Sequence, residues 1–397
     1  MPQTISNHVA EIQGLYGPVT VSEKLIQRLW LRGDYQKDTL KTESGKSIIV
    51  KRPGRWNMQE GPDFIGAELM INGKPVNGDV ELHFYARDWF AHQHHEQRRF
   101  DKVVLHVVVF PPPSNAAIHT LSGYEPETLV LLPHMSVDLE AYAADEAMRE
   151  WESRDSASIL EKFLYKAPEE REHQIIENAR KRFFQKVAFA RKRLDKSGSE
   201  QAYHQMTLEI LGYRRNRSPM STIAEAYKAR TFLSDSPEDI FKSQQEHWKL
   251  SGLRPANHPR KRLEQYAKLL RDSPDWVTKL QAWGKAQRIS EGTFSKDTKA
   301  YRRTKRLTAQ RREIADIILA GAIGGTRLDT WAIDGLIPLL AISKPNAWFP
   351  LWFHWFPGDM PDAVSNFLQH CELPEKAQPR SNGWLQGAWQ IFLESGL

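Results

Sequence analysis

The chain has 397 residues, of which 40% are hydrophobic and 26% charged, proportions typical of a globular protein with a buried core. This length predicts two domains. The net charge of +6 is mildly basic and favours a polyanionic partner only weakly. The single cysteine, Cys371, excludes an intramolecular disulfide and a cysteine-rich zinc motif.

The same features predict a cytoplasmic protein with neither a membrane nor a disulfide partner. One cysteine fits a reducing compartment. The opening stretch, MPQTISNHVAEIQG, lacks the charged and apolar regions of a secretion signal. No apolar run approaches the ~20 residues that a membrane helix needs.

The first third of the chain has the pattern of a helix followed by strands. Residues 21–32 predict an amphipathic helix, with Leu25 and Leu29 on its apolar side. Strand-like runs follow at 47–52, 63–71, 78–85, 102–110 and 127–132. Residues 87–101, between the third and fourth runs, predict a helix or helical turn. A crossover at that point implies that the third and fourth strands run parallel.

The remainder of the chain predicts helices almost throughout. We therefore expect an α/β domain at residues 1–135, with a mixed sheet flanked by helices, and a mostly α-helical domain at residues 136–397. The densest aromatic stretch, residues 348–357, could stack on unpaired bases. Filling a helical core is the commoner use of such residues, and we interpret the stretch as core.

Acidic residues recur where two neighbouring strands are predicted. Asp63 begins the second strand, and Asp79, Glu81 and His83 alternate along the third, which places these three on one face. Because paired strands lie ~4.8 Å apart, Asp63 and Glu81 can converge. The pattern predicts either a catalytic carboxylate cluster or a solvated, structural pair of acids at strand ends.

Two resemblances concern these residues. The order helix, three-strand meander, helix, strand, with Pro62-Asp63 and Glu81-Leu82-His83, resembles the PD-(D/E)XK nuclease superfamily and implies a restriction-endonuclease-like core. His83 stands where that superfamily has lysine. The blocks EKLIQRLW, GPDF, GDVELH, DWFAHQHH, VVLHVVV and RPANHPRKRLEQYA are similar to those of an uncharacterised bacterial family, a domain of unknown function.

The nuclease resemblance implies a set of metal ligands and catalytic groups. Asp63, Glu81 and the Leu82 carbonyl would hold Mg²⁺ or Mn²⁺, zinc being the poorer candidate, with Glu23 as an additional ligand. The same resemblance assigns catalytic roles to Asp63, Glu81 and His83. A lysine moved to position 51 or 102 (Lys51 or Lys102) could replace the missing one, or activity could be altered or lost.

Histidines are concentrated in the same region. Five of the fourteen lie between positions 83 and 106: His83, His92, His94, His95 and His106. In a helix, His92 would share one face with Asp88 and with His95. The cluster could be a transition-metal site. Alternatively it is a hydrogen-bonded scaffold in which Asp88 and Trp89 anchor a loop and His106 bonds a buried acid, an interpretation that we favour for His94 and His95. Asp79, His92 and His106 are candidates to support the carboxylate site.

Two basic tracts, residues 179–196 and 299–313, predict contacts to nucleic-acid phosphates. The candidate contacts are Arg180, Arg182, Arg191, Arg193, Arg302, Arg303, Lys305 and Arg306. Ordinary solvated helix faces would explain these tracts equally well. The leading functional hypothesis is a metal-dependent nuclease acting on DNA or RNA. The alternatives are a non-catalytic nucleic-acid-binding protein on a degenerate nuclease scaffold, and a histidine-rich metal enzyme of other chemistry.

Overall fold

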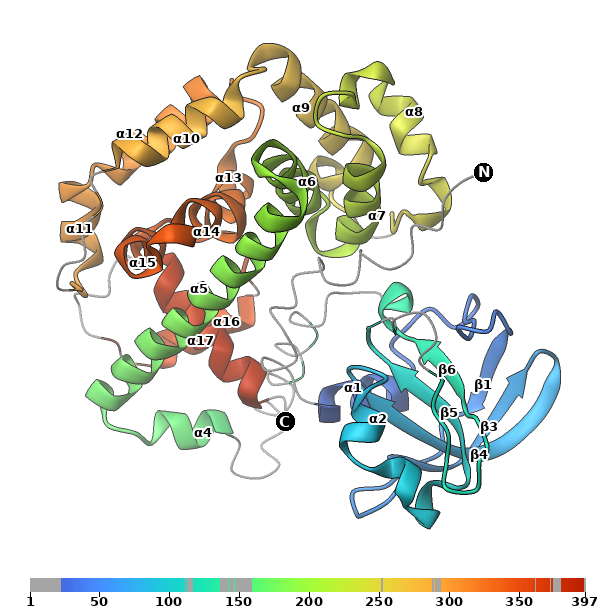
Figure 1. Cartoon of the computed structure of the whole chain (residues 1–397). Helices are drawn as coiled ribbons and strands as arrows, with labels where there is room; N and C mark the ends of the chain where they lie inside the picture. The colour runs from blue at the N-terminus through green and yellow to red at the C-terminus, as the bar shows by residue number, and fades with distance from the viewer. Residues whose placement is uncertain are drawn as a thin grey trace. The chain divides into compact units, whose positions relative to one another are not determined.

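A computed structural model describes most of the chain, in two compact units, Met1–Glu140 and Ala141–Ser395 (Figure 1). The described residues are 23–110, 112, 117–135, 142, 146, 159–250, 253–287, 289, 294–360, 362–371, 373 and 380–395. Among these residues, none of the helices has the length and apolar character needed to cross a membrane.

The first unit contains helix α1 (Glu23–Arg32) and a six-stranded mixed sheet. The strands are β1 (Ile48–Arg52), β2 (Arg55–Trp56), β3 (Phe64–Ile71), β4 (Lys74–His83), β5 (Val103–Val108) and β6 (Glu127–Val130). Their order is β1-β3-β4-β5-β6, and β2 pairs with β3. Neighbours are antiparallel from β1 to β4 and parallel from β4 to β6. The predicted parallel pairing across the crossover is confirmed.

Strand β4 lies in the interior of the sheet, and its second half, from Asp79 to His83, is buried on both faces. Val80 and Leu82 are buried on one face, and Asp79 and Glu81, only 7% and 5% exposed, on the other. The solvated alternative for the acids is therefore wrong: β3 and β5 flank the strand, and α1 contacts it.

A β-bulge in β3 sets the register beside these acids. The pairing of β3 with β4 shifts between Phe64 and Ala67, where Gly66 has a left-handed φ of 68°. The backbone N–H of Gly66 donates to Asp79 Oδ1 over 2.9 Å. Asp79 thus stabilises the bulge, beyond which Phe64 pairs with Val80. This register places Asp63, which precedes Phe64, opposite Glu81, which follows Val80.

The β4–β5 crossover is a series of short turns. It consists of α2 (Asp88–Ala91), η3 (His94–Glu96) and η4 (Arg98–Phe100). Gln93, between the first two, is left-handed with φ 58°. Because α2 ends at Ala91, His92 and His95 do not share a helix face, and that expectation is wrong.

The second unit is helical throughout its described residues. Its α-helices are α4 (Ile159–Leu164), α5 (Pro168–Ser197), α6 (Ser199–Leu211), α7 (Tyr213–Ala226), α8 (Pro237–Lys242), α9 (Pro259–Asp272), α10 (Trp276–Ala286), α11 (Thr298–Thr304), α12 (Leu307–Arg312), α13 (Gly325–Trp331), α14 (Ile337–Leu340), α15 (Pro345–His354), α16 (Asp362–His370) and α17 (Asn382–Ser395). Short 3-10 and π-helical turns connect several of them.

Helix α5 is the long helix against which much of this unit packs (Figure 1). Its closest neighbour is α17: a Cβ added to Gly387 would lie 2.0 Å from the carbonyl oxygen of Ile175, so only glycine permits this approach. The aromatic side chains of α15, including Trp352 and Phe353, are fully buried. The interpretation of residues 348–357 as core is confirmed for this helix.

Candidate metal and catalytic site

Asp63 and Glu81 meet at one end of the β3–β4 pair. The backbone N–H of Asp63 donates to Glu81 Oε2 over 2.9 Å, and the backbone N–H of Leu82 donates to Asp63 Oδ2 over 2.9 Å. Each carboxylate is therefore held by the backbone of the opposite strand.

Helix α1 contributes a side chain that the sequence analysis did not identify. Gln27 Nε2 donates to Asp63 Oδ1 over 2.6 Å, and Gln27 Oε1 accepts from Trp56 Nε1 over 3.0 Å. Gln27 follows Glu23 by four residues, so both side chains lie on one face of α1. This i,i+4 spacing from Glu23, a predicted metal ligand, was the feature of the sequence that could have identified Gln27.

Asp63 and Glu81 have no lysine or arginine partner among the residues that the structure describes. Burial, reinforced by the charge of Glu81, raises the pKa of Asp63 above its ordinary value. Burial also raises the pKa of Glu81, and the charge of Glu23 adds to that rise. The pKa of Glu23, on the half-buried start of α1, is itself raised by burial. Burial and mutual repulsion thus disfavour the charged forms of these three neighbouring acids.

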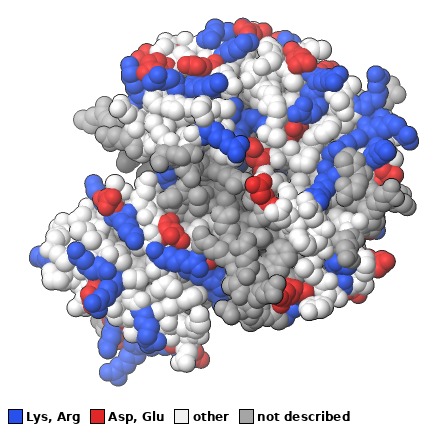
Figure 2. Space-filling view, turned by 180° about the vertical axis from the view of Figure 1, so that it is seen from behind, with Lys and Arg blue, Asp and Glu red and all other residues white. Residues whose placement is uncertain are grey.

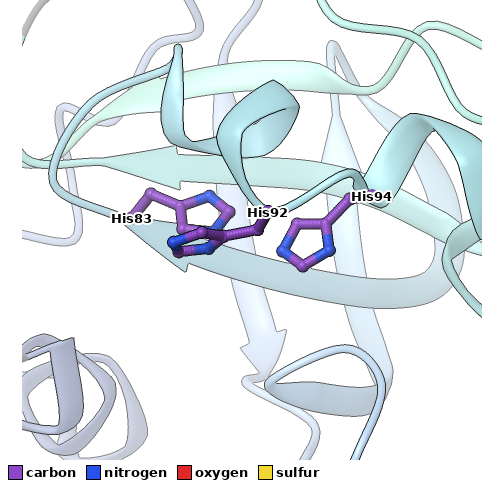
Figure 3. Close-up of side chains that lie close together, drawn as sticks. All are labelled: His83, His92 and His94. Atoms are coloured by element: carbon purple, nitrogen blue, oxygen red, sulfur yellow. The ribbon is translucent and has the colours of Figure 1, made fainter.

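His83 and His94 face the other oxygen of Glu81, and His92 lies beside His83; Figure 3 shows the three rings grouped together. His83 ends β4, His92 follows α2 and His94 begins η3. His94 Nε2 lies 3.1 Å and His83 Nε2 3.6 Å from Glu81 Oε1, and His83 Nε2 lies 3.1 Å from His92 Nδ1. One ring nitrogen of each histidine lies within 4.8 Å of those of the other two. His94 thus lies in the cluster, and the structural role that we favoured for it stays a prediction.

His106 and Trp89 lie behind this cluster. The fully buried His106 is hydrogen-bonded through Nε2 to His83 Nδ1 over 2.8 Å. Its partner is therefore an imidazole and not the buried acid that we expected. Trp89 contacts the rings of His94 and His106, and its indole N–H donates to the His119 carbonyl over 3.0 Å. The anchoring role predicted for Trp89 is confirmed.

Burial keeps several of these imidazoles neutral. It lowers the pKa of His83 well below the ordinary value, the pKa of His94 to about 4 and that of His106 to about 3. A neutral imidazole offers one nitrogen lone pair, the form that binds a metal or accepts a proton.

The other candidates near the sheet lie outside the cluster. Asp79 accepts the backbone N–H of Gly66 in the β-bulge. Lys51 and Lys102 are exposed, and neither pairs with Asp63 or Glu81 in the described structure. His95 points toward Glu96, with 3.4 Å between Nε2 and Oε1, and toward the ring of Phe90.

Five of the eight predicted basic contacts have structural partners inside the helical unit, including Arg180, which lies 3.8 Å from Glu177 and 4.3 Å from the ring centre of Phe349. Arg182 is fully buried and donates to Gln386, so its guanidinium is not on the surface. Arg193 pairs with Glu209. Arg191 donates to the Ile342 carbonyl over 2.5 Å. Arg302 donates to the His354 and Trp355 carbonyls, and burial lowers its pKa to about 10.

The remaining basic candidates are more accessible. Arg303 and Arg306 are exposed, and Lys305 is half-buried. Figure 2 shows lysine and arginine side chains scattered over the visible face, with acidic side chains between them. This distribution is compatible with ordinary solvated surfaces as well as with phosphate contacts.

The fold and the site define an α+β protein with a buried cluster of acids and histidines. A family profile described as "Protein of unknown function (DUF2851)" matches residues 23–240, more than half of the chain, and the protein belongs to this family. The match includes α1, the whole sheet and every residue of the cluster. No curated protein and no solved structure matches the chain.

Proposed function

We propose that the protein is a divalent-metal-dependent phosphodiesterase that acts on nucleic acid, with Asp63 and Glu81 at its centre. The observation that carries this proposal is the pair of carboxylates on adjacent strands, Glu81 buried and Asp63 half-buried, each bonded to the other strand's backbone and lacking a lysine or arginine partner among the described residues. Uncompensated buried carboxylates at one point are a recurrent feature of cation sites.

The order of the elements supports the nuclease interpretation. Helix α1 precedes the antiparallel β1-β3-β4 meander, and the α2 crossover leads to the parallel strand β5. A restriction-endonuclease-like core has this order, with one acid beginning the middle strand of the meander and a second acid on the next strand.

The donor set suits a hard cation. Asp63 and Glu81 would hold it, with the Leu82 carbonyl and Glu23 as further ligands, and Mg²⁺ or Mn²⁺ prefers such oxygens. Each oxygen of Asp63 accepts one hydrogen bond and keeps a second lone pair. A bound divalent cation would stabilise the negative charge that develops on a phosphoryl oxygen during hydrolysis.

His83 occupies the position at which the nuclease superfamily has lysine. Because its pKa is depressed by burial, its ring supplies a lone pair and no positive charge at neutral pH. That lone pair can accept a proton from water or bind a cation. The exposed Arg303 and Arg306 are the candidates for phosphate contacts.

Cleavage assays with supercoiled, linear and single-stranded substrates, in Mg²⁺ or Mn²⁺, test this proposal. We expect cleavage by the wild-type protein, and a loss of at least about 100-fold in Asp63→Asn and Glu81→Gln. Glu68→Gln, which changes an exposed acid of β3 that pairs with Arg52, is the matched control and should retain activity. Equal activity in all three variants would contradict the assignment.

One observation favours a second candidate function. No lysine accompanies the two acids in the described structure, which is the pattern expected of a nuclease scaffold that binds nucleic acid without cutting it. Binding of labelled DNA or RNA without cleavage in either metal, unchanged in Asp63→Asn, would support this alternative over the first.

A further inference from the structure

His83, His92 and His94 each place one ring nitrogen within 4.8 Å of those of the other two, close enough to bind one metal ion, and Glu81 lies beside two of them. The three measured separations among Glu81 Oε1, His83 Nε2, His92 Nδ1 and His94 Nε2 are 3.1, 3.1 and 3.6 Å. Two ligands bound at ~2.0–2.1 Å to a tetrahedral ion lie ~3.3 Å apart. The separations therefore fit a single ion of this kind.

His94 is buried and oriented as a metal-binding histidine would be. The residue is only 9% exposed, and neither ring nitrogen makes a hydrogen bond to another described residue, although Nε2 lies 3.1 Å from Glu81 Oε1. Stacking on Phe100, with ring centres 3.9 Å apart, holds the ring in this orientation. A buried imidazole without a hydrogen bond is costly unless another interaction compensates.

The surroundings also suit a metal centre. His106 accepts or donates the hydrogen bond at His83 Nδ1, which leaves Nε2 as the nitrogen facing Glu81. Such an outer partner commonly orients a metal-binding imidazole. His92 is exposed, so the cluster is reached from solvent on that side.

We propose that His83, His92, His94 and Glu81 bind one transition-metal ion of the Zn²⁺ class, distinct from the hard cation proposed at Asp63. Three imidazoles and one carboxylate are a donor set that suits Zn²⁺, Co²⁺ or Fe²⁺ better than Mg²⁺. In this arrangement the lone pair of His83 Nε2 serves as a ligand and does not accept a proton.

Glu81 connects this centre to the proposed carboxylate site. Its Oε1 faces the histidines, whereas its Oε2 accepts the backbone N–H of Asp63. One carboxylate can therefore contribute to both sites. The inference itself does not rest on phosphodiesterase activity, because binding of the ion is measured without substrate.

Titration of the chelator-treated full chain with Co²⁺, followed by competition with Zn²⁺, tests the inference. We expect one Co²⁺ per chain, with the intense visible absorption of tetrahedral Co²⁺, displaced by one equivalent of Zn²⁺. His92→Gln and His94→Gln should weaken binding at least tenfold. His95→Gln is the matched control, since His95 neighbours His94 but points away from the cluster, and its affinity should change less than twofold.

Circular dichroism and thermal unfolding establish that each variant is folded, and the exposed His92 keeps the test valid if His94→Gln does not fold. The inference is overturned if Co²⁺ binds without a tetrahedral spectrum, if no stoichiometric binding occurs, or if His95→Gln is as impaired as His92→Gln. Stoichiometric binding without any cleavage would instead remove only the proposed function. Cleavage in Mg²⁺ without Co²⁺ binding would remove only this inference.

Discussion

Burial disfavours the charged forms of both the acids and the buried histidines of the cluster, so the two kinds of group do not neutralise each other by forming ion pairs. The pKa values of Asp63 and Glu81 are raised, and those of His83 and His94 are lowered, so the charged forms of all four groups are disfavoured. In the absence of a cation this arrangement costs folding stability. Natural proteins keep such costs chiefly where function requires them.

The corresponding prediction concerns Glu81→Gln. The amide retains an oxygen to accept the backbone N–H of Asp63, and its NH₂ group can donate to the lone pair of His94 or His83. We expect the metal-free variant to be more stable than the wild type at pH 7.5 by about 1–2 kcal/mol, because a buried charge is removed.

Denaturant unfolding in the presence of a chelator measures this difference. Added Zn²⁺ should then stabilise the wild type and not the variant. Glu68→Gln, at an exposed position of β3, should leave both measurements unchanged. A destabilised Glu81→Gln would show that the carboxylate is a structural acid.

At the scale of elements, the bulge in β3 and the turns after α2 determine which side chains meet. Gly66 adopts φ 68°, and the extra residue places Asp63 beside Glu81. Gln93, with φ 58°, prevents the helix from continuing after His92. The chain turns at this residue, and His94 therefore faces the cluster. Both features depend on a single left-handed residue.

We predict that Gly66→Ala lowers the free energy of unfolding by about 1–2 kcal/mol, the cost of a left-handed L-residue. The space around Gly66 is open, so no steric clash contributes. Gly324→Ala is the control, because Gly324 is also uncrowded and has an extended backbone with φ −144°. Chemical denaturation compares the two, and an equal loss would exclude backbone strain as the cause.

At the scale of the whole molecule, the helical unit buries several lysine and arginine side chains that the sequence alone would place on the surface. Lys186, on α5, lies 2.8 Å from Asp334, and Arg217 lies 3.7 Å from the same carboxylate. Burial opposes ionisation of Asp334, but the charges of Lys186 and Arg217 outweigh it and hold its pKa below the ordinary value.

This pair predicts a pH dependence of stability. A depressed pKa of the folded state means that the contribution of Asp334 is fully present at neutral pH and is lost as the pH falls through that pKa. Asp334→Asn should cost about 3–5 kcal/mol at pH 7, since it leaves a buried lysine without its carboxylate. The difference from wild type should shrink below about pH 4, near the ordinary pKa of aspartate.

Urea unfolding at a series of pH values tests this prediction, with Asp272→Asn as the control. Asp272 forms an exposed i,i+4 pair with Lys268, and its loss should have no measurable effect at any pH. A pH-independent difference between Asp334→Asn and wild type would contradict the assigned role.

The sequence by itself predicted helix α1 and five of the six strands of the first unit, and it placed Asp63 and Glu81 on adjacent strands where they could converge. Strand alternation, turn residues and the crossover rule are local signals, and a two-residue period places Glu81 and His83 on one face without further information. Helical spacing places Gln27 on the same face of α1 as Glu23, but only the structure showed that Gln27 donates a hydrogen bond to Asp63.

Only the tertiary structure decided which histidines join the acids and which arginines are buried. His94 rather than His95 faces Glu81 because Gln93 is left-handed, and Arg182 is buried because α17 approaches α5 at Gly387. Neither backbone reversals nor helix contacts between distant segments leave a periodic pattern along the chain. The sequence pattern specifies which face a side chain occupies, and packing specifies what that face meets.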